Sequence, residues 1–174
     1  LQRLLHPGVS PKDARMKQTL EWLSRVEMTG TYAVALRCNV WAMLGPAHKY
    51  RKQFAKDVKY LVDGVDGRGA YNYIPAGHGR VSSEGRAGRH LGRYDNSNSQ
   101  LAVLGVWAGA ENRIEVPIWY WDMVDKHWRN DQQDDGGWCY QHSGTSYGSM
   151  SVAGLATMFI CFDALYYRKF IKCR

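Results

Sequence analysis

A short run of polar side chains, Asp95 to Gln100, comes nearest in this sequence to the residue types of a catalytic site. It reads Asp-Asn-Ser-Asn-Ser-Gln and precedes an apolar stretch, so it lies where a helix is expected to begin. A general acid needs a side chain that gives up its proton readily, and neither a serine hydroxyl nor an asparagine amide does so. Such side chains also cap helices by accepting hydrogen bonds from free backbone N–H groups. Capping is the first interpretation, and the alternative is that Asp95, Asn96, Ser97 and Asn98 contact a ligand.

The segment around Gly136 offers a second group of residue types that can bind a metal. Cys139, His142 and either Asp134 or Asp135 lie close together in the sequence. Structural zinc sites normally have four ligands in paired spacing, which this segment lacks, and Asp is an ordinary turn former. The chain also has no P-loop, Gly-x-Ser-x-Gly or His-Glu-x-x-His segment. We therefore expect no metal and no cofactor.

Large aromatic side chains in or just before apolar stretches are the candidates to line a cavity for an apolar ligand. Trp107, Tyr147 and Phe159 have this position. Core packing is the default for such residues, because large aromatics dominate protein cores. Core packing is thus the first interpretation for Trp107, Tyr147 and Phe159, and contact with an apolar ligand is the alternative.

Six stretches with helical periodicity must position these residues. Three are amphipathic, and each is followed, directly or across a loop, by a more apolar one. Amphipathic helices are expected to face solvent, and the apolar ones to be covered on both sides. The sequence therefore predicts an all-α fold without strands. The expected helices span residues 12–28, 32–44, 49–62, 97–110, 117–130 and 149–166.

Composition excludes several classes of protein. Hydrophobic residues make up 45% of the 174 residues and aromatics 13%, which indicates a globular chain. The net charge of +7 comes largely from a Gly/Arg-rich insert, residues 74–93, and from residues 168–174. Nucleic-acid binding is not expected, because the basic residues of the insert are not interleaved with aromatics. The longest apolar run, 152–162, is about half of a membrane span, so no transmembrane segment is expected.

The four cysteines show no disulfide or metal spacing, and they leave the cellular compartment undecided. No linker divides the chain. We expect one array over residues 1–174, with 74–93 as a loop insert.

One pattern recurs three times along this array: an aromatic residue at the end of a helical stretch, followed by a Gly-x-aromatic turn. Glycine permits the tight turn, and the second aromatic can fill the gap between neighbouring helix pairs. We expect Tyr32, Tyr71 and Trp138 to occupy equivalent positions. The repeated residues are Trp22, Gly30 and Tyr32, then Tyr60, Gly69 and Tyr71, then Trp128, Gln133, Gly136 and Trp138.

The pattern resembles the QW motif of the squalene-cyclase and protein-prenyltransferase superfamily, in which an aromatic and an aliphatic residue precede Gln and Gly-x-Trp. The third copy fits except at Arg129, and the other two lack the Gln and the final Trp. The resemblance implies helical hairpins packed side by side as an arc of an α/α toroid. Six or seven hairpins close the family's ring, so the three expected here would need the remaining repeats of the polypeptide or a protein partner.

Bacterial squalene-hopene cyclases of this superfamily carry an Asp-x-Asp-Asp-Thr-Ala segment whose middle Asp is the catalytic acid. In the corresponding run, Asp95 takes the first position, but Ser97 replaces the acid and Asn98 the last Asp. We therefore expect no cyclase chemistry and no catalytic residue in this chain. A carbohydrate-active α/α barrel would need inward-facing carboxylate pairs, for which only Asp95 and Glu111 are candidates.

The leading interpretation is a non-catalytic scaffold or binding module within a larger protein or assembly. The alternative is a fragment of a terpene cyclase whose catalytic acid lies elsewhere.

Overall fold

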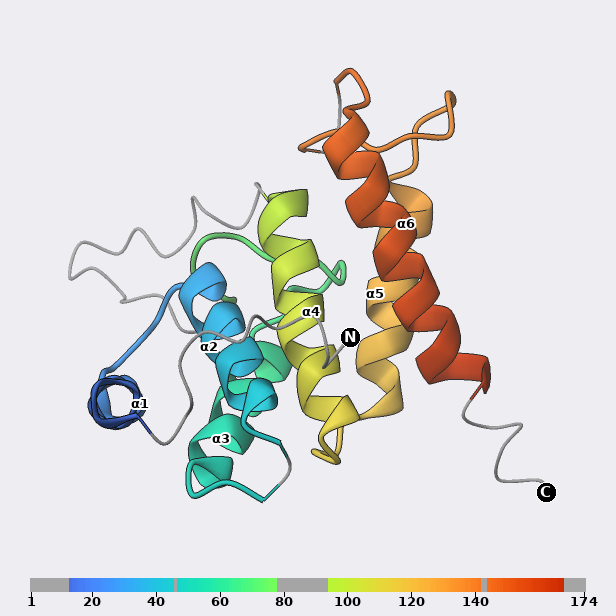
Figure 1. Cartoon of the computed structure of the whole chain (residues 1–174). Helices are drawn as coiled ribbons and strands as arrows, with labels where there is room; N and C mark the ends of the chain where they lie inside the picture. Colours follow the sequence, from blue (N-terminus) through green and yellow to red (C-terminus); the bar gives the residue numbers. More distant parts are fainter. Residues whose placement is uncertain (1–12, 46, 78–93, 142–143, 168–174) are drawn as a thin grey trace.

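The computed structural model describes residues 13–45, 47–77, 94–141 and 144–167, and in this part of the chain every regular element is helical. The prediction of an all-α fold is confirmed. Each of the six predicted ranges overlaps one α-helix, with ends that differ by a few residues, and the insert at 74–93 lies largely outside the described residues (Figure 1). The elements are α1 Ala14–Arg25, α2 Thr31–Met43, α3 Arg51–Asp63, α4 Asn96–Glu111, α5 Ile118–Asn130, α6 Gly148–Phe162 and a short π-helical turn, η1 Asp163–Tyr167.

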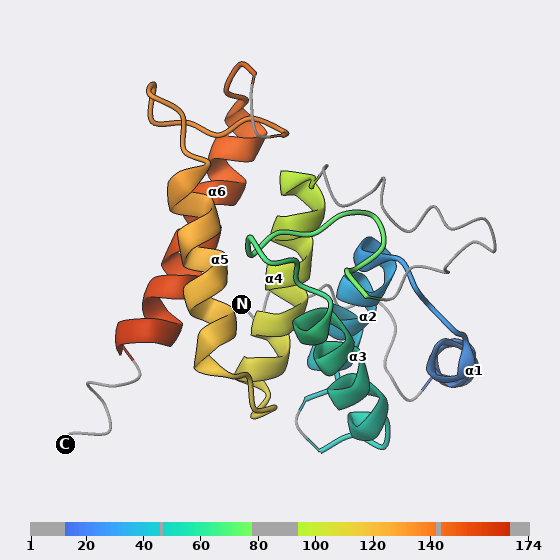
Figure 2. The same cartoon turned by 180° about the vertical axis from the view of Figure 1, so that it is seen from behind.

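Helix α4 lies at the centre of the molecule. It packs against α2 and α3 on one side and against α6 on the other, as the views from both sides show (Figures 1 and 2). Two glycines of α4 permit this close packing. A Cβ atom at Gly105 would lie 3.0 Å from the Ala35 Cα of α2, and one at Gly109 would lie 2.5 Å from the Val58 side chain of α3. The small residues of α4 therefore set how closely its neighbours approach.

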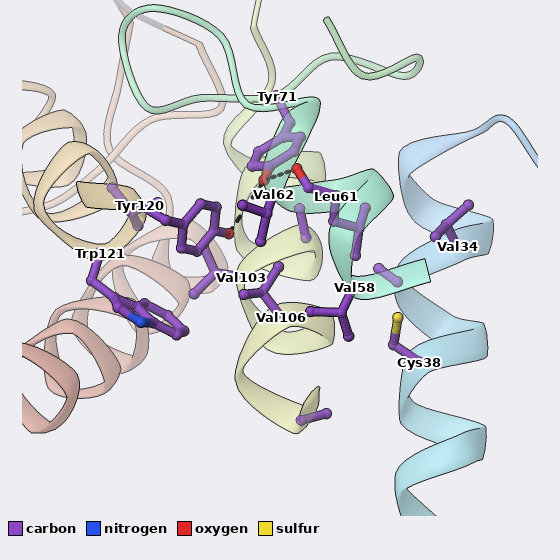
Figure 3. Close-up of a cluster of buried hydrophobic side chains, with 14 of the residues drawn as sticks. Val34, Cys38, Val58, Leu61, Val62, Tyr71, Val103, Val106, Tyr120 and Trp121 are labelled. Carbon is purple, nitrogen blue, oxygen red and sulfur yellow. Dashed lines mark hydrogen bonds between the residues drawn. The ribbon is translucent and has the colours of Figure 1, made fainter. Parts of the chain in front are cut away.

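The core is formed where α2, α3, α4 and α5 meet (Figure 3). Aliphatic side chains such as Val34, Val58 and Val103 are at most 1% exposed. Burying a side chain of this size contributes about 1.5–3 kcal/mol to folding. The Tyr71 hydroxyl enters the same core and donates a hydrogen bond of 2.6 Å to the Leu61 carbonyl. The polar end of the ring is therefore satisfied although it is buried.

The turns that follow α3 and α5 have the same backbone hydrogen bonds. Gly69 donates to the Asp66 carbonyl at 3.0 Å, and Gly136 donates to the Gln133 carbonyl at 2.8 Å. Both glycines have a left-handed backbone, with φ of 88° and 82°, which a residue with a Cβ adopts at a cost. A second bond closes each turn in the opposite direction, from Asp66 N–H to the Ala70 carbonyl and from Gln133 N–H to the Gly137 carbonyl.

The aromatic residue after each of these turns connects two helices. The Trp138 indole donates to the Trp128 carbonyl of α5 at 2.7 Å, as the Tyr71 hydroxyl does to the Leu61 carbonyl of α3. The backbone N–H groups of Tyr71 and Trp138 donate to hydroxyls in the next helix. Their acceptors are Ser99 in α4 and Ser151 in α6, at 2.9 and 3.1 Å.

The carbonyls of the same two aromatics accept the N–H of the residue that caps the next helix, Asp95 for Tyr71 and Tyr147 for Trp138. Trp138 also lies flat against Gly154 of α6, where a Cβ would come within 2.5 Å of the indole ring.

The turn between α1 and α2 does not share this arrangement. Gly30 has φ of −79°, and Tyr32 and Trp22 are 52% and 62% exposed. Thr31 is buried in their place, and its hydroxyl donates to the Asn72 carbonyl. The expected equivalence of Tyr32 with Tyr71 and Trp138 is therefore wrong, because the chain enters α2 in an extended conformation that points Tyr32 outward.

The first aromatic of the second copy, Tyr60, is also not equivalent to Trp128 of the third copy. Since the Leu61 and Trp128 carbonyls accept the equivalent bonds, Leu61 is the counterpart of Trp128. Tyr60 instead donates its hydroxyl to the Thr29 carbonyl at 2.9 Å. It thus connects α3 to the segment before α2.

Helix α1 makes several polar contacts with the rest of the chain. Arg37 of α2 donates to the Leu23 and Val26 carbonyls at the end of α1, at 3.3 and 2.7 Å. Glu21 accepts from Lys49 at 2.6 Å and from the Tyr50 hydroxyl at 3.0 Å. Only Leu20 of α1 is buried.

One helical stretch of the described chain, Gly148–Tyr166, is long and apolar enough to cross a membrane by length and composition, and 28% of it is buried. A core helix of a soluble domain meets the same criterion. The absence of a transmembrane segment therefore stays an expectation.

Candidate functional site

The first turn of α4 contains the polar run that the sequence singled out. Asp95 is 3% exposed, and its carboxylate accepts the Asn98 backbone N–H at 2.8 Å. It therefore caps the helix in the way that short polar side chains do. The Tyr140 hydroxyl donates to the same carboxylate, and this hydrogen bond is the main reason why the pKa of Tyr140 is raised, with burial second.

A buried polar network joins this turn to the end of α5. The Asn96 amide nitrogen donates to the Asp131 carboxylate at 2.6 Å and to the Cys139 carbonyl at 2.9 Å. Its amide oxygen lies 3.0 Å from the His127 Nε2 atom. The Tyr94 hydroxyl donates to the second Asp131 oxygen, and burial together with this bond raises the pKa of Tyr94. All five residues are buried, so the network holds α4 and α5 together in a setting with little water.

An open hollow of about 490 Å³ lies beside this network. The Arg68 guanidinium lies at its edge, 5.0 Å from the centre of the Tyr94 ring. Charged residues of the rim have acidic neighbours, since Arg68 pairs with Asp66 and Lys126 with Asp122. The lining residues are Gly67, Arg68, Tyr94, Met123, Lys126, His127, Asn130 and Asp131.

The chemistry that this arrangement can perform is limited. The Asp95 and Asp131 carboxylates both accept hydrogen bonds from neighbouring groups of the chain. The His127 Nε2 atom lies against the amide oxygen of Asn96. In the described part of the chain no group of three or more His, Cys, Asp or Glu side chains is placed to hold a metal ion, and His142 lies outside that part.

The structure brings together only some of the residues that were expected to contact a ligand. Asp95, Asn96, Ser97 and Asn98 share the first turn of α4, and the buried Asn98 amide oxygen has no hydrogen-bond partner. The three aromatic candidates lie elsewhere, and none of them lines the hollow. Trp107 is half-buried on α4, Tyr147 precedes α6 and is 56% exposed, and Phe159 is 66% exposed on α6.

The sequence analysis missed His127, Asp131 and Tyr94 as members of a polar cluster. His127 and Asp131 are four residues apart and therefore share one face at the end of a helix, which is a signal that the sequence does contain. The contact of both residues with Asn96 depends on how α4 packs on α5, and no spacing within the sequence reveals it.

Comparison of the chain with family models, with curated proteins and with solved structures finds no match.

Proposed function

We propose that this chain is a non-catalytic scaffold or binding module built from helical repeats of the squalene-cyclase and prenyltransferase type, within a larger protein or assembly. The observation that carries the proposal is the pair of matching turns after α3 and α5. Both have a left-handed glycine, and in both the following aromatic donates to the end of the preceding helix. Repeat proteins are built from such units, each packed on its neighbours.

In this proposal α3 with α4 and α5 with α6 are two hairpins of an arc of an α/α toroid. The central position of α4, with α2 on one side and α6 on the other, is consistent with inner helices lying in a row. Helices α1 and α2 make a third, less regular pair, since the turn between them has neither a left-handed glycine nor a buried aromatic at Tyr32.

The non-catalytic part of the proposal is supported by the contacts of the carboxylates. An acid that protonates an alkene must face its substrate in a dry site, whereas these two carboxyl groups are occupied in a helix cap and in a buried hydrogen-bond network. Asp95 accepts from a backbone N–H and from Tyr140, and Asp131 accepts from Tyr94 and Asn96.

The test is to incubate the purified chain with squalene in detergent and to analyse the extract for cyclic products by gas chromatography and mass spectrometry. A squalene-hopene cyclase serves as the positive control, and we expect the chain to yield no more product than buffer. Asp95→Asn and Asp131→Asn are measured beside it. Product from the unmodified chain that either variant abolishes would overturn the proposal and favour a terpene cyclase.

A further inference from the structure

The outer face of α6 and η1 is a continuous apolar stripe. Its five large side chains follow one another at intervals of three or four residues, so they lie on one side of the helix. Apolar patches of this extent on a protein surface commonly mark interaction sites. The α6 stripe consists of Val152, Leu155, Phe159, Phe162 and Tyr166, which are between 45% and 69% exposed.

The matching turns show what covers the same face on α4. Because Ser151 bonds Trp138 as Ser99 bonds Tyr71, Ser151 of α6 corresponds to Ser99 of α4. In this register Leu155 corresponds to Val103. Val103 is 1% exposed and lies beside Tyr120 of α5 in the core, whereas Leu155 is 54% exposed (Figure 3).

The same difference holds further along the two helices. Phe159 corresponds to Trp107 and Phe162 to Ala110, and both α4 residues are half-buried, whereas Phe159 and Phe162 are 66% and 56% exposed. The positions that are covered on α4, which packs against α6, are thus open on α6. The surface that would complete α6 is therefore another helical surface.

Helix α2, on the far side of α4 from α6, has a second apolar stripe. Tyr32, Leu36 and Met43 are 52%, 44% and 57% exposed, and they lie opposite the buried side of α2 that contains Val34 and Cys38. We call these three residues the α2 stripe. Neither stripe contains a charged side chain, so no like charges oppose their contact.

We propose that copies of this chain associate head to tail, with the α6 stripe of one copy packed on the α2 stripe of the next. The inference rests on the proposed scaffold function and names its partner as a second copy. Since α2, α4 and α6 lie in a row, the free side of α2 and the free side of α6 are its two ends (Figures 1 and 2). The contact joins two different surfaces, and such heterologous contacts build rings or open chains.

Two variants test this head-to-tail contact. The α6 variant carries Leu155→Glu with Phe162→Glu, and the α2 variant carries Leu36→Glu with Met43→Glu. Sedimentation velocity of the unmodified chain should show assembly that grows with concentration, and each variant alone should stay monomeric, with its dissociation constant raised at least tenfold. An equimolar mixture should form a complex of one copy of each, because one intact stripe of each kind remains.

A matched control carries the same added charge on α1, as Ala14→Glu with Gln18→Glu at exposed positions, and it should assemble like the unmodified chain. Helix content is checked by circular dichroism. Where a glutamate variant loses helix content, serine at the same positions replaces it, because serine also removes the apolar side chain without adding charge.

Several outcomes would overturn the inference. A folded, unmodified chain that stays monomeric at millimolar concentration excludes self-association, and it leaves the absence of cyclase activity untouched. Dimers of the α2 variant alone would show contact of α6 with α6. Flotation of the chain with phosphatidylcholine vesicles, lost in the α6 variant, would identify a lipid surface as the occupant. Cyclic products in the squalene assay, by contrast, would refute only the non-catalytic function.

Discussion

The ion pair of Arg37 and Asp57 has the least solvent exposure of the charged contacts described in the molecule. Two nitrogens of the guanidinium donate to the two carboxylate oxygens at 2.8 and 2.7 Å, and both side chains are at most 4% exposed. Trp41 and Gln53 donate to the same carboxylate, at 3.0 and 2.8 Å. A buried pair of this kind adds little stability over apolar residues of equal size, but loss of one partner leaves an uncompensated charge.

Asp57→Ala is therefore expected to lower the free energy of unfolding by about 3–5 kcal/mol, because the Arg37 charge would remain buried without its carboxylate counter-charge. The control on the same helix is Asp63→Ala, which breaks an exposed pair with Lys59 and is expected to cost about 0.2–1 kcal/mol. Urea unfolding followed by circular dichroism measures both. Equal losses in the two variants would contradict the prediction.

Buried thiols give a second prediction at the residue scale. Burial raises the pKa of the Cys38 thiol well above its ordinary value and that of Cys161 to about 12. Since the thiolate is the reactive species, alkylation of both by iodoacetamide at mildly alkaline pH should be much slower in the folded chain than in urea. Peptide mass spectrometry measures the rate at each cysteine. Similar rates in the two states would show that the thiols are accessible.

At the scale of the elements, the turns after α3 and α5 connect each helix to the next and hold the two together. Each turn depends on a glycine for its backbone and on an aromatic for its connection to the helices on either side. The loss of one hydrogen bond leaves a helix-end carbonyl buried without its donor, which costs more than the bond itself contributes.

Tyr71→Phe removes only the hydroxyl and is expected to cost about 1–3 kcal/mol, because the Leu61 carbonyl loses one of its donors and the buried Tyr120 hydroxyl loses its bond with Tyr71. Trp138→Phe removes the equivalent donor and also ring volume, so it should cost at least as much. Tyr32→Phe is the control, since Tyr32 is exposed and should change stability by less than about 0.5 kcal/mol. Thermal unfolding of the three variants measures the losses, and a large effect at Tyr32 would argue against the different role of its turn.

The attachment of α1 to the rest of the chain is expected to weaken at acid pH. Hydrogen bonds from Lys49, then Tyr50 and Arg25, lower the pKa of Glu21 from 4.5 to about 2. The folded pKa lies below the ordinary value, so the contact is fully present above pH 4.5 and is lost as the pH falls toward 2. NMR titration of the α1 amides should show this transition, and Glu21→Gln should abolish it. The same transition in the variant would assign it to another group.

Much of the helix order followed from sequence periodicity, because amphipathic and apolar stretches differ in the spacing of their hydrophobic residues. The outward position of Tyr32 could not be predicted from the sequence. A Gly-x-aromatic pattern specifies residue types and not the backbone angle at Gly30 that points Tyr32 outward. Capping by Asp95 followed from residue type and position. The cluster of Asn96, His127 and Asp131 did not, because it forms only when α4 packs on α5.

At the scale of the whole molecule, stability is expected to differ along the chain. Helix α1 has one buried residue, whereas α4 is buried along much of its length between α2 and α6. Regions with few buried apolar contacts open locally at low free-energy cost. Hydrogen exchange measured by mass spectrometry should therefore be faster in α1 than in α4, and equal protection would show that α1 is part of the same cooperative unit.

The contact between Trp138 and Gly154 also has a consequence for evolution. Since a Cβ at position 154 would meet the indole ring, position 154 cannot gain a side chain while position 138 is tryptophan. Homologues with alanine or a larger residue at position 154 are expected to have a ring smaller than indole at position 138. Position 148, where a Cβ would meet open space, should vary independently. Correlated substitution at positions 138 and 154 among homologues would thus indicate that the turn after α5 still packs against α6.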